Sequence, residues 1–270
     1  MSKTKSNEVK DCLTQPDVHE QWENDYRSAE NEKFYETVFD RLAATLDAKN
    51  GSSIVDVGCG IGAHSVRLAN RGFRVTGIDF AQGVLDQAKS RVEILGLSDR
   101  VQFQQQDLLE LTLPADSYDY VLCWGVLMHI PNVELAIAEL MRIVKPGGKL
   151  IIGEGNMHSL QARSMHFLKR LLRKGEGTIN ITPQGYETWT SGSAGTHVTR
   201  QANIGWIIRT IESDAYVLTD RLPGQFTELY TRFKNHAARR LIHCLNDVFF
   251  KFVPLPSLAQ GNILIFKKKK

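Results

Sequence analysis

Short apolar runs alternate with longer amphipathic segments between residues 53 and 153, and this alternation restricts the fold more than any other feature. Buried strands are predicted at 53–57, 73–78, 101–105, 118–123 and 150–153. Helical spacing of apolar residues predicts helices at 32–50, 63–69, 81–95 and 133–144. Strands that alternate with helices in this way form βαβ units. We therefore expect an α/β fold with a doubly wound, mostly parallel sheet.

The alternation stops after Gly155, and this change divides the chain. With 270 residues, the chain has room for one α/β core and an elaboration. We predict an N-terminal segment (1–30) that begins with a loose end over 1–16, a core (31–155), an insert (156–200) and a C-terminal part of the core fold (201–270). The insert is expected to hold a helix at 160–174 and a loop-rich stretch at 175–199. Further helices are expected at 201–213 and 238–252, and strands at 215–219 and 262–266.

The charge balance argues against nucleic acid as a partner. The formal charge is +3, from 33 Lys and Arg against 30 Asp and Glu, and four of the lysines form the run 267–270. The rest of the chain is nearly neutral and predicts no basic stripe for nucleic acid. The lysine run is interpreted as a solvated end.

The sequence also indicates a compartment and excludes a common metal site. The four cysteines are scattered and match no zinc-ligand spacing, so no metal is expected. The chain shows neither the apolar region of a signal peptide nor a stretch long enough to span a bilayer. A cytoplasmic location is the expectation.

A glycine-rich loop follows the first strand of the core. Its sequence is Gly58-Cys59-Gly60-Ile61-Gly62, and Asp56 lies inside the strand itself. Glycines in such a loop let a ligand approach the backbone closely. A dinucleotide fingerprint has the spacing G-x-G-x-x-G with an acid about 20 positions on. The spacing here differs, so a nicotinamide-dependent dehydrogenase is disfavoured.

Segment 55–62 resembles the first motif of the class I S-adenosylmethionine-dependent methyltransferases. Three later segments are similar to further motifs of that family: 77–80 to the one with the ribose-binding acid, 106–108 to the one that meets adenine, and 144–150 to the turn into the fifth strand. The resemblance covers about residues 30–155, with a weaker match in the last strand. It implies a Rossmann-like sheet of seven strands with an antiparallel last strand, and S-adenosylmethionine as cofactor.

The resemblance also implies roles for individual residues. The glycines would line the methionine part of the cofactor, Asp56 would orient the loop, Asp79 would bind the ribose and Asp107 the exocyclic amine of adenine. Considered alone, Asp56 and Asp79 are also typical of turn and loop caps, and Cys59 of a small filler. The predicted cofactor set is Asp56, Gly58, Cys59, Gly60, Gly62, Asp79, Phe80, Asp107, Leu108, Cys123 and Trp124.

The end of the fourth strand is where an acceptor is expected to meet the cofactor. Residues 123–131 lack the Asn/Asp-Pro-Pro-Tyr and Pro-Cys sequences of nucleic-acid methyltransferases. They are similar instead to the ubiquinone, menaquinone and other small-molecule methyltransferases, in which a histidine often follows this strand. His129 is therefore the candidate general base. The alternative is a packing histidine before Pro131.

The insert is predicted to form a cap over the acceptor. Its candidate acceptor-binding residues are Tyr186, Trp189, His197 and Arg200. The alternative is that its aromatic residues form a small core of their own. A basic stripe of Arg163, His166, Arg170 and Arg173 fits either a solvated helix face or a peripheral lipid contact.

The function predicted from these features is methyl transfer from S-adenosylmethionine to an oxygen or nitrogen of a small molecule. Two alternatives stay open: carbon methylation of a quinone-like or lipid acceptor, and a degenerate methyltransferase fold that binds a partner. A small-molecule acceptor is the expected partner. Nucleic acid binding and stable membrane insertion are not expected, and the sequence favours no particular oligomeric state.

Overall fold

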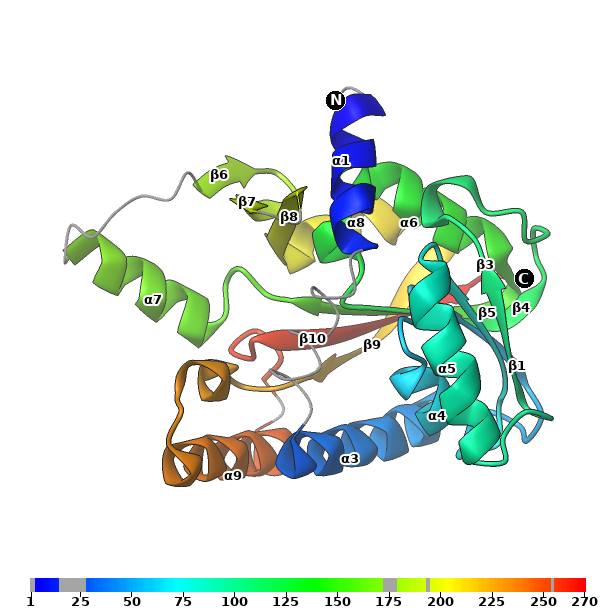
Figure 1. Cartoon of the computed structure of the whole chain (residues 1–270), viewed down its shortest axis with the longest axis horizontal. Coiled ribbons are helices and arrows are strands. Elements are labelled where there is room, and N and C mark those ends of the chain that lie inside the picture. Colours follow the sequence, from blue (N-terminus) through cyan, green and yellow to red (C-terminus); the bar gives the residue numbers. More distant parts are fainter. Residues whose placement is uncertain (1–2, 15–27, 172–178, 193–194, 254) are drawn as a thin grey trace.

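The computed structural model describes residues 3–14, 28–171, 179–192, 195–253 and 255–270. A seven-stranded sheet forms the centre of the described part, and helices cover both of its faces (Figure 1). The strand order is β3-β2-β1-β4-β5-β10-β9. These strands are β1 (Ser53–Val57), β2 (Arg74–Asp79), β3 (Val101–Gln105), β4 (Tyr118–Trp124), β5 (Val144–Gly155), β9 (Tyr216–Pro223) and β10 (Gly261–Lys268).

The strand directions confirm the predicted sheet. The pairs from β3 through β5 are all parallel, whereas β10 runs antiparallel to β5 and to β9. Successive side chains of β1 enter opposite cores: Ile54 packs on one face of the sheet, and Val55 and Val57 on the other. Burial on both faces explains why the central strands are almost continuously apolar.

Helices cover both faces of the sheet, and several of them begin at polar caps. One face of the sheet is covered by α3 (Ala29–Leu46), α4 (Ala63–Ala69), α5 (Gln82–Ile94) and α9 (His236–Phe252), and the other by α6 (Val133–Ile143) and α8 (Ile204–Ile211). Asn132, Asn203 and Asn235 cap α6, α8 and α9, where each side chain accepts a hydrogen bond from a backbone N–H of the first turn.

The N-terminal segment is more ordered than expected. A loose end was predicted for residues 1–16, and this is wrong for the described part, which forms α1 (Lys3–Leu13). Val9, Cys12 and Leu13 lie at helical spacing and are buried. Their partners are residues far along the chain. Packing against the insert therefore stabilises a helix that the mostly polar sequence of this segment does not predict.

The insert has its own sheet. Helix α7 (Leu160–Leu171) covers most of the predicted 160–174, of which 172–174 lie outside the described residues. The predicted loop-rich stretch contains three antiparallel strands, β6 (Ile179–Thr182), β7 (Gly185–Gly192) and β8 (Gly195–Ala202). The expectation of loops is therefore wrong there. Alternate residues of β8, Val198, Arg200 and Ala202, are buried, as in a strand with one covered face.

The lysine run at 267–270 is only partly a solvated end. Lys267 and Lys268 belong to β10, and Lys268 Nζ donates to Asp116 Oδ1 at 2.7 Å and to the Val144 carbonyl at 2.9 Å. Lys269 and Lys270 are exposed as predicted. The last strand therefore uses one lysine of the run to bind the edge where β5 begins.

Candidate cofactor and acceptor site

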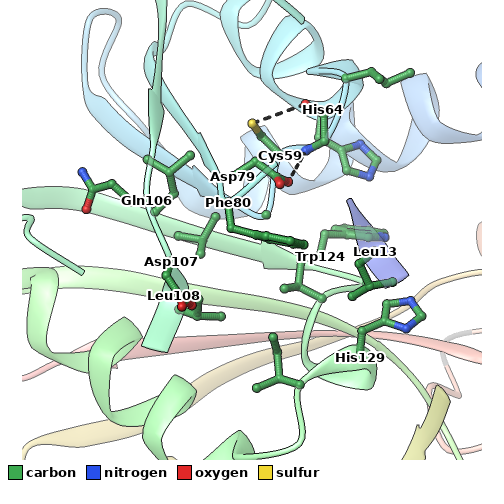
Figure 2. Close-up of a pocket in the computed structure, with 18 of the residues that line it drawn as sticks. Leu13, Cys59, His64, Asp79, Phe80, Gln106, Asp107, Leu108, Trp124 and His129 are labelled. Atoms are coloured by element: carbon green, nitrogen blue, oxygen red, sulfur yellow. Dashed lines mark hydrogen bonds between the residues drawn. The ribbon is translucent and has the colours of Figure 1, made fainter. Parts of the chain in front are cut away.

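A cavity of about 340 Å³ lies at the carboxyl ends of β1, β2 and β4 (Figure 2). Parallel strands bring the loops that follow them to one edge of the sheet, and ligands of open α/β sheets bind at this edge. Helix α1 closes the cavity from outside through Val9, Lys10 and Leu13. Most of the predicted cofactor residues line it, namely Gly58, Cys59, Gly60, Asp79, Phe80, Asp107, Leu108 and Trp124.

The glycine loop is shaped by contacts that side chains would break. Gly58 has φ +70°, and a Cβ built on it would lie 2.4 Å from Val126 Cγ2. Gly60 has φ +51°, and a Cβ there would meet no atom within 4 Å. Gly58 is therefore required by packing against the β4 loop, whereas Gly60 leaves open space at the cavity wall.

Asp79 joins the glycine loop to the end of β2. Its Oδ2 accepts a hydrogen bond from the Gly60 N–H at 3.0 Å, and its Oδ1 accepts one from the Ala81 N–H at 3.0 Å. Each carboxylate oxygen has further acceptor capacity. The buried Asp79 carboxyl therefore fixes the loop and presents acceptors at the cavity.

Asp56 lies beneath the loop rather than in the cavity wall. Its Oδ2 accepts a hydrogen bond from Ser65 Oγ of α4 at 2.7 Å, and burial raises its pKa to about 6. Cys123 and Gly62, also predicted as cofactor contacts, are likewise outside the cavity lining, and Cys123 is fully buried in the core. Burial raises the pKa of the Cys59 thiol well above its ordinary value, in agreement with a filler role.

Asp107 has two partners at the cavity edge. Its Oδ1 accepts from the Leu109 N–H at 3.0 Å and caps the turn η1 (Leu108–Glu110). Its Oδ2 is paired with Lys10 Nζ of α1. The acid that the sequence predicts for adenine is therefore covered by a lysine of the N-terminal helix, a residue that the sequence alone did not single out.

The turn η2 (Leu127–His129) holds the candidate base in a defined orientation. His129 Nδ1 lies 3.0 Å from the Val198 carbonyl oxygen of β8. A carbonyl can only accept, so Nδ1 donates this hydrogen bond and Nε2 is the basic nitrogen of the ring. His129 also lines the cavity. The arrangement is the one that a neutral histidine base requires.

Two buried ionisable residues hold this turn. Arg200 Nη1 donates to the carbonyls of Leu127 at 2.8 Å and of Ile130 at 3.0 Å, and its Nη2 pairs with Glu187 Oε1 at 2.7 Å. Glu154 Oε1, at the end of β5, accepts from the Leu127 N–H at 2.8 Å. Burial raises the pKa of Glu154 to about 8. Glu154 could not be singled out from sequence, because its function depends on a turn 27 positions earlier.

The predicted acceptor residues of the insert lie outside the cavity lining. The Tyr186 ring stacks on His166 at 4.5 Å, and Trp189 packs against the cluster of Val9, Leu13 and Val198. His197 Nδ1 lies 3.7 Å from Cys12 Sγ, and the Arg200 guanidinium is bonded to protein groups as above. These side chains bind α1, α7 and the η2 turn, as the alternative of a small separate core implies.

A group of aromatic side chains forms part of the cavity wall. Tyr35, His64 and Trp124 line the cavity, with the His64 and Trp124 ring centroids 5.2 Å apart and those of Tyr35 and His64 5.4 Å apart. Burial lowers the pKa of His64 to about 3, so this histidine is neutral and stays a packing group. Its place directly after the glycine loop was the available sequence signal.

Comparisons with known proteins identify the fold. Residues 55–152 match the family model described as a methyltransferase domain. The chain is 30% identical over 164 residues to 27-O-demethylrifamycin SV methyltransferase of Amycolatopsis mediterranei. The aligned region covers 60% of each chain. The chain is also 30% identical over 155 residues to a ubiquinone biosynthesis O-methyltransferase of Coxiella burnetii, covering 57% of this chain and 63% of that protein. Residues 55–152 therefore carry a methyltransferase domain, and the chain spans about 60% of the length of these curated relatives.

Solved structures show the same fold over most of the chain. The magnesium protoporphyrin IX methyltransferase of Synechocystis aligns with a TM-score of 0.63 at 17% identity, over 94% of this chain and 95% of that one. The [4+2]-cyclase SpnF aligns with a TM-score of 0.57 at 20% identity, over 87% and 81%. Because a cyclase shares the fold, the reaction has to be argued from the site.

Two further properties bear on function. The described residues contain no group of His, Cys, Asp and Glu side chains that could hold a metal ion. Within the same residues, every helix is too short or too polar to cross a bilayer. The predicted cytoplasmic location stays a prediction.

Proposed function

We propose that this protein transfers the methyl group of S-adenosylmethionine to a small-molecule acceptor bound near His129 and Trp124. The observation that carries the proposal is the Asp79 carboxyl, which accepts from the Gly60 N–H at the wall of the cavity in a methyltransferase domain. When bound, S-adenosylmethionine supplies an activated methyl group on a sulfonium sulfur. The protein must then align the acceptor and exclude water.

The residues of the cavity fit this cofactor. The open space at Gly60 admits a ligand against the backbone, and the Asp79 and Asp107 carboxylates offer acceptors to hydroxyl and amine groups. Asp107 can accept a hydrogen bond from the cofactor through Oδ2 once its ion pair with Lys10 is broken. We assign Gly58 and Gly60 to the methionine part, Asp79 to the ribose, and Asp107 with Leu108 to the adenine.

Methylation of an oxygen or nitrogen is the favoured reaction. An acceptor hydroxyl loses its proton as the methyl group arrives, and an acceptor ammonium loses one beforehand to free its electron pair. His129 Nε2 takes up this proton while Nδ1 stays bonded to the Val198 carbonyl. The two O-methyltransferase relatives support oxygen as the acceptor atom. Tyr35, Trp124 and Leu13 limit the access of water to the reacting atoms.

Carbon methylation of a quinone-like or lipid acceptor is the second candidate. It is favoured by the apolar and aromatic character of the cavity wall around Tyr35, Trp124 and Ile130. A sterol 24-C-methyltransferase of Gibberella zeae is 33% identical over 108 residues, covering 40% of this chain and 28% of that protein. Retention of Gly60, Asp79 and Asp107 argues against a degenerate fold that only binds a partner. Incubation of metabolite extracts with isotope-labelled cofactor would identify the acceptor and the methylated atom.

Binding of the cofactor product tests the assignment directly. Replacement Asp79→Ala removes a charge-assisted hydrogen bond, so affinity for S-adenosylhomocysteine should fall by about one to two decades, equivalent to roughly 1.5–3 kcal/mol. Calorimetry measures this change, and Asp86→Ala on the exposed side of α5 is the matched control. Unchanged affinity in Asp79→Ala would refute the assignment of the ribose site.

A further inference from the structure

Helix α9 presents an apolar stripe to the surface. Leu241, Leu245, Val248 and Phe252 are spaced by 4, 3 and 4 residues, so they follow one side of the helix. Their exposed fractions are 72%, 47%, 48% and 75%. The other side of α9 is already packed, because Phe249, Phe250 and Asn246 are buried against the rest of the molecule. The stripe is thus additional to the face that the fold uses.

Two further exposed apolar residues flank α9 in the sequence. Phe233 precedes the helix and Leu255 follows it, and both side chains are about half exposed. Figure 1 shows α9 at the lower edge of the molecule, roughly in line with α3. An apolar strip of this length is typical of an interaction surface rather than of scattered surface residues.

The segment that carries the stripe is basic. Segment 232–255 contains five Lys and Arg and one acidic residue, so its formal charge is +4, whereas the whole chain has +3. The remainder of the chain is therefore slightly negative. The basic residues are Arg232, Lys234, Arg239, Arg240 and Lys251. Apolar and basic side chains on one helix are the pattern of a helix that lies in the interface of an anionic membrane.

We propose that the α9 surface, defined as Leu241, Leu245, Val248 and Phe252 with the exposed basic residues Arg240 and Lys251 beside them, docks on anionic phospholipid. The apolar stripe enters the boundary between headgroups and acyl chains, and the basic side chains bind lipid phosphate and carboxylate groups.

Docking through α9 would bring the cavity close to the bilayer. Phe250, on the packed side of α9, contacts Phe34 of α3 with ring centroids 5.4 Å apart. The next residue of α3, Tyr35, lines the cavity. The proposal itself needs neither cofactor nor acceptor, so it stands or fails independently of the methyl-transfer assignment.

Vesicle binding tests the proposal. We expect the full chain to co-sediment with vesicles that contain about one third phosphatidylserine in phosphatidylcholine, and to bind pure phosphatidylcholine at least tenfold more weakly. Raising the salt concentration should release it, because screening weakens the charged contacts. Leu241→Ser combined with Phe252→Ser should lower binding at least tenfold, and Arg240→Glu combined with Lys251→Glu should do the same.

A matched control and a direct probe sharpen the test. Ile94→Ser changes an apolar residue of α5 that is 84% exposed, and it should leave vesicle binding unchanged. Cys244 is the exposed cysteine of α9 and the other three are buried, so an environment-sensitive dye can be attached to it selectively. The dye emission should shift to the blue on vesicles with phosphatidylserine.

Three results would overturn the proposal. One is the absence of binding to either vesicle, and another is equal loss of binding in Ile94→Ser and in the α9 variants. The third is a dimer of the wild-type chain that Leu241→Ser with Phe252→Ser dissociates, which would make α9 an interface between copies. Far-UV circular dichroism and the thermal unfolding midpoint of the same variants should stay unchanged and verify that they are folded.

Discussion

At the scale of single residues, the η2 turn combines the proposed base, His129, with the groups that orient it. Val198 sets the tautomer of His129, while Arg200 and Glu154 hold the backbone on both sides of the turn. Removing one partner of a buried ion pair costs about 3–5 kcal/mol because it leaves a buried charge unpaired. Arg200, predicted as an acceptor ligand, is thus better explained as a group that positions the base.

Replacement of His129 separates catalysis from binding. If its Nε2 accepts the acceptor proton, His129→Ala should lower turnover by about 10²–10⁴-fold with little change in cofactor affinity. His129→Gln should not restore the rate, since an amide can bond the acceptor but cannot take its proton. The wild-type rate should also fall as the pH is lowered, because protonation of the histidine removes the basic nitrogen. Near wild-type turnover in His129→Ala would make this histidine a packing residue.

Buried Glu154 should make stability depend on pH. Its pKa is raised to about 8 in the folded state, against about 4.3 for a solvated glutamate, so between these values the folded state binds more protons. The contribution of Glu154 to the free energy of unfolding therefore falls as pH rises through this range, by up to about 1.4 kcal/mol per pH unit.

The isosteric variant Glu154→Gln measures that contribution. Glutamine is neutral at every pH and keeps an acceptor for the Leu127 N–H, so the variant should gain stability relative to wild type as the pH is raised from about 5 to 8. Urea unfolding at both pH values gives the difference. Because Asp56 and Glu228 also have raised pKa values, the comparison must be made between the two proteins. A pH-independent difference would contradict the prediction.

At the scale of elements, α1 is both a wall of the cavity and a competitor for one of its acids. Lys10 is paired with Asp107 Oδ2, and Val9 and Leu13 pack with Val198 and partly buried Phe80. The adenine assigned to Asp107 has to replace the lysine. The energy involved is modest, because partly exposed ion pairs contribute roughly 0.2–1 kcal/mol.

Removing the lysine should therefore strengthen cofactor binding. Lys10→Ala is expected to raise the affinity for S-adenosylhomocysteine by about two- to fivefold, in line with the loss of a partly exposed pair. Lys49→Ala, outside the cavity lining, serves as the control in the same calorimetric titration. Weaker binding in Lys10→Ala would mean that the lysine contacts the ligand instead of competing with it.

The elements that the sequence predicted share a physical property, and so do those that it missed. The strands of the core read correctly because burial on both faces makes them apolar throughout, and the glycine loop and Asp79 follow from their order along the chain. Helix α1 and strand β8 are stabilised by one another across about 185 residues. The same holds for three residues of the site, Glu154, Lys10 and Tyr35. They reach the site only through contacts between distant segments, which no local sequence pattern predicts.

At the scale of the whole molecule, the antiparallel direction of β10 separates the two ends of the chain. β10 begins beside the end of β5, at the cavity edge of the sheet, and runs to the opposite edge, where Lys270 lies near Gly147. Helix α1 instead closes the cavity, and Figure 1 shows the two ends on different sides. Tethering the protein to a sensor surface by its carboxyl end would leave the cavity facing the solution, whereas an affinity tag on the amino end would extend from the helix that closes it.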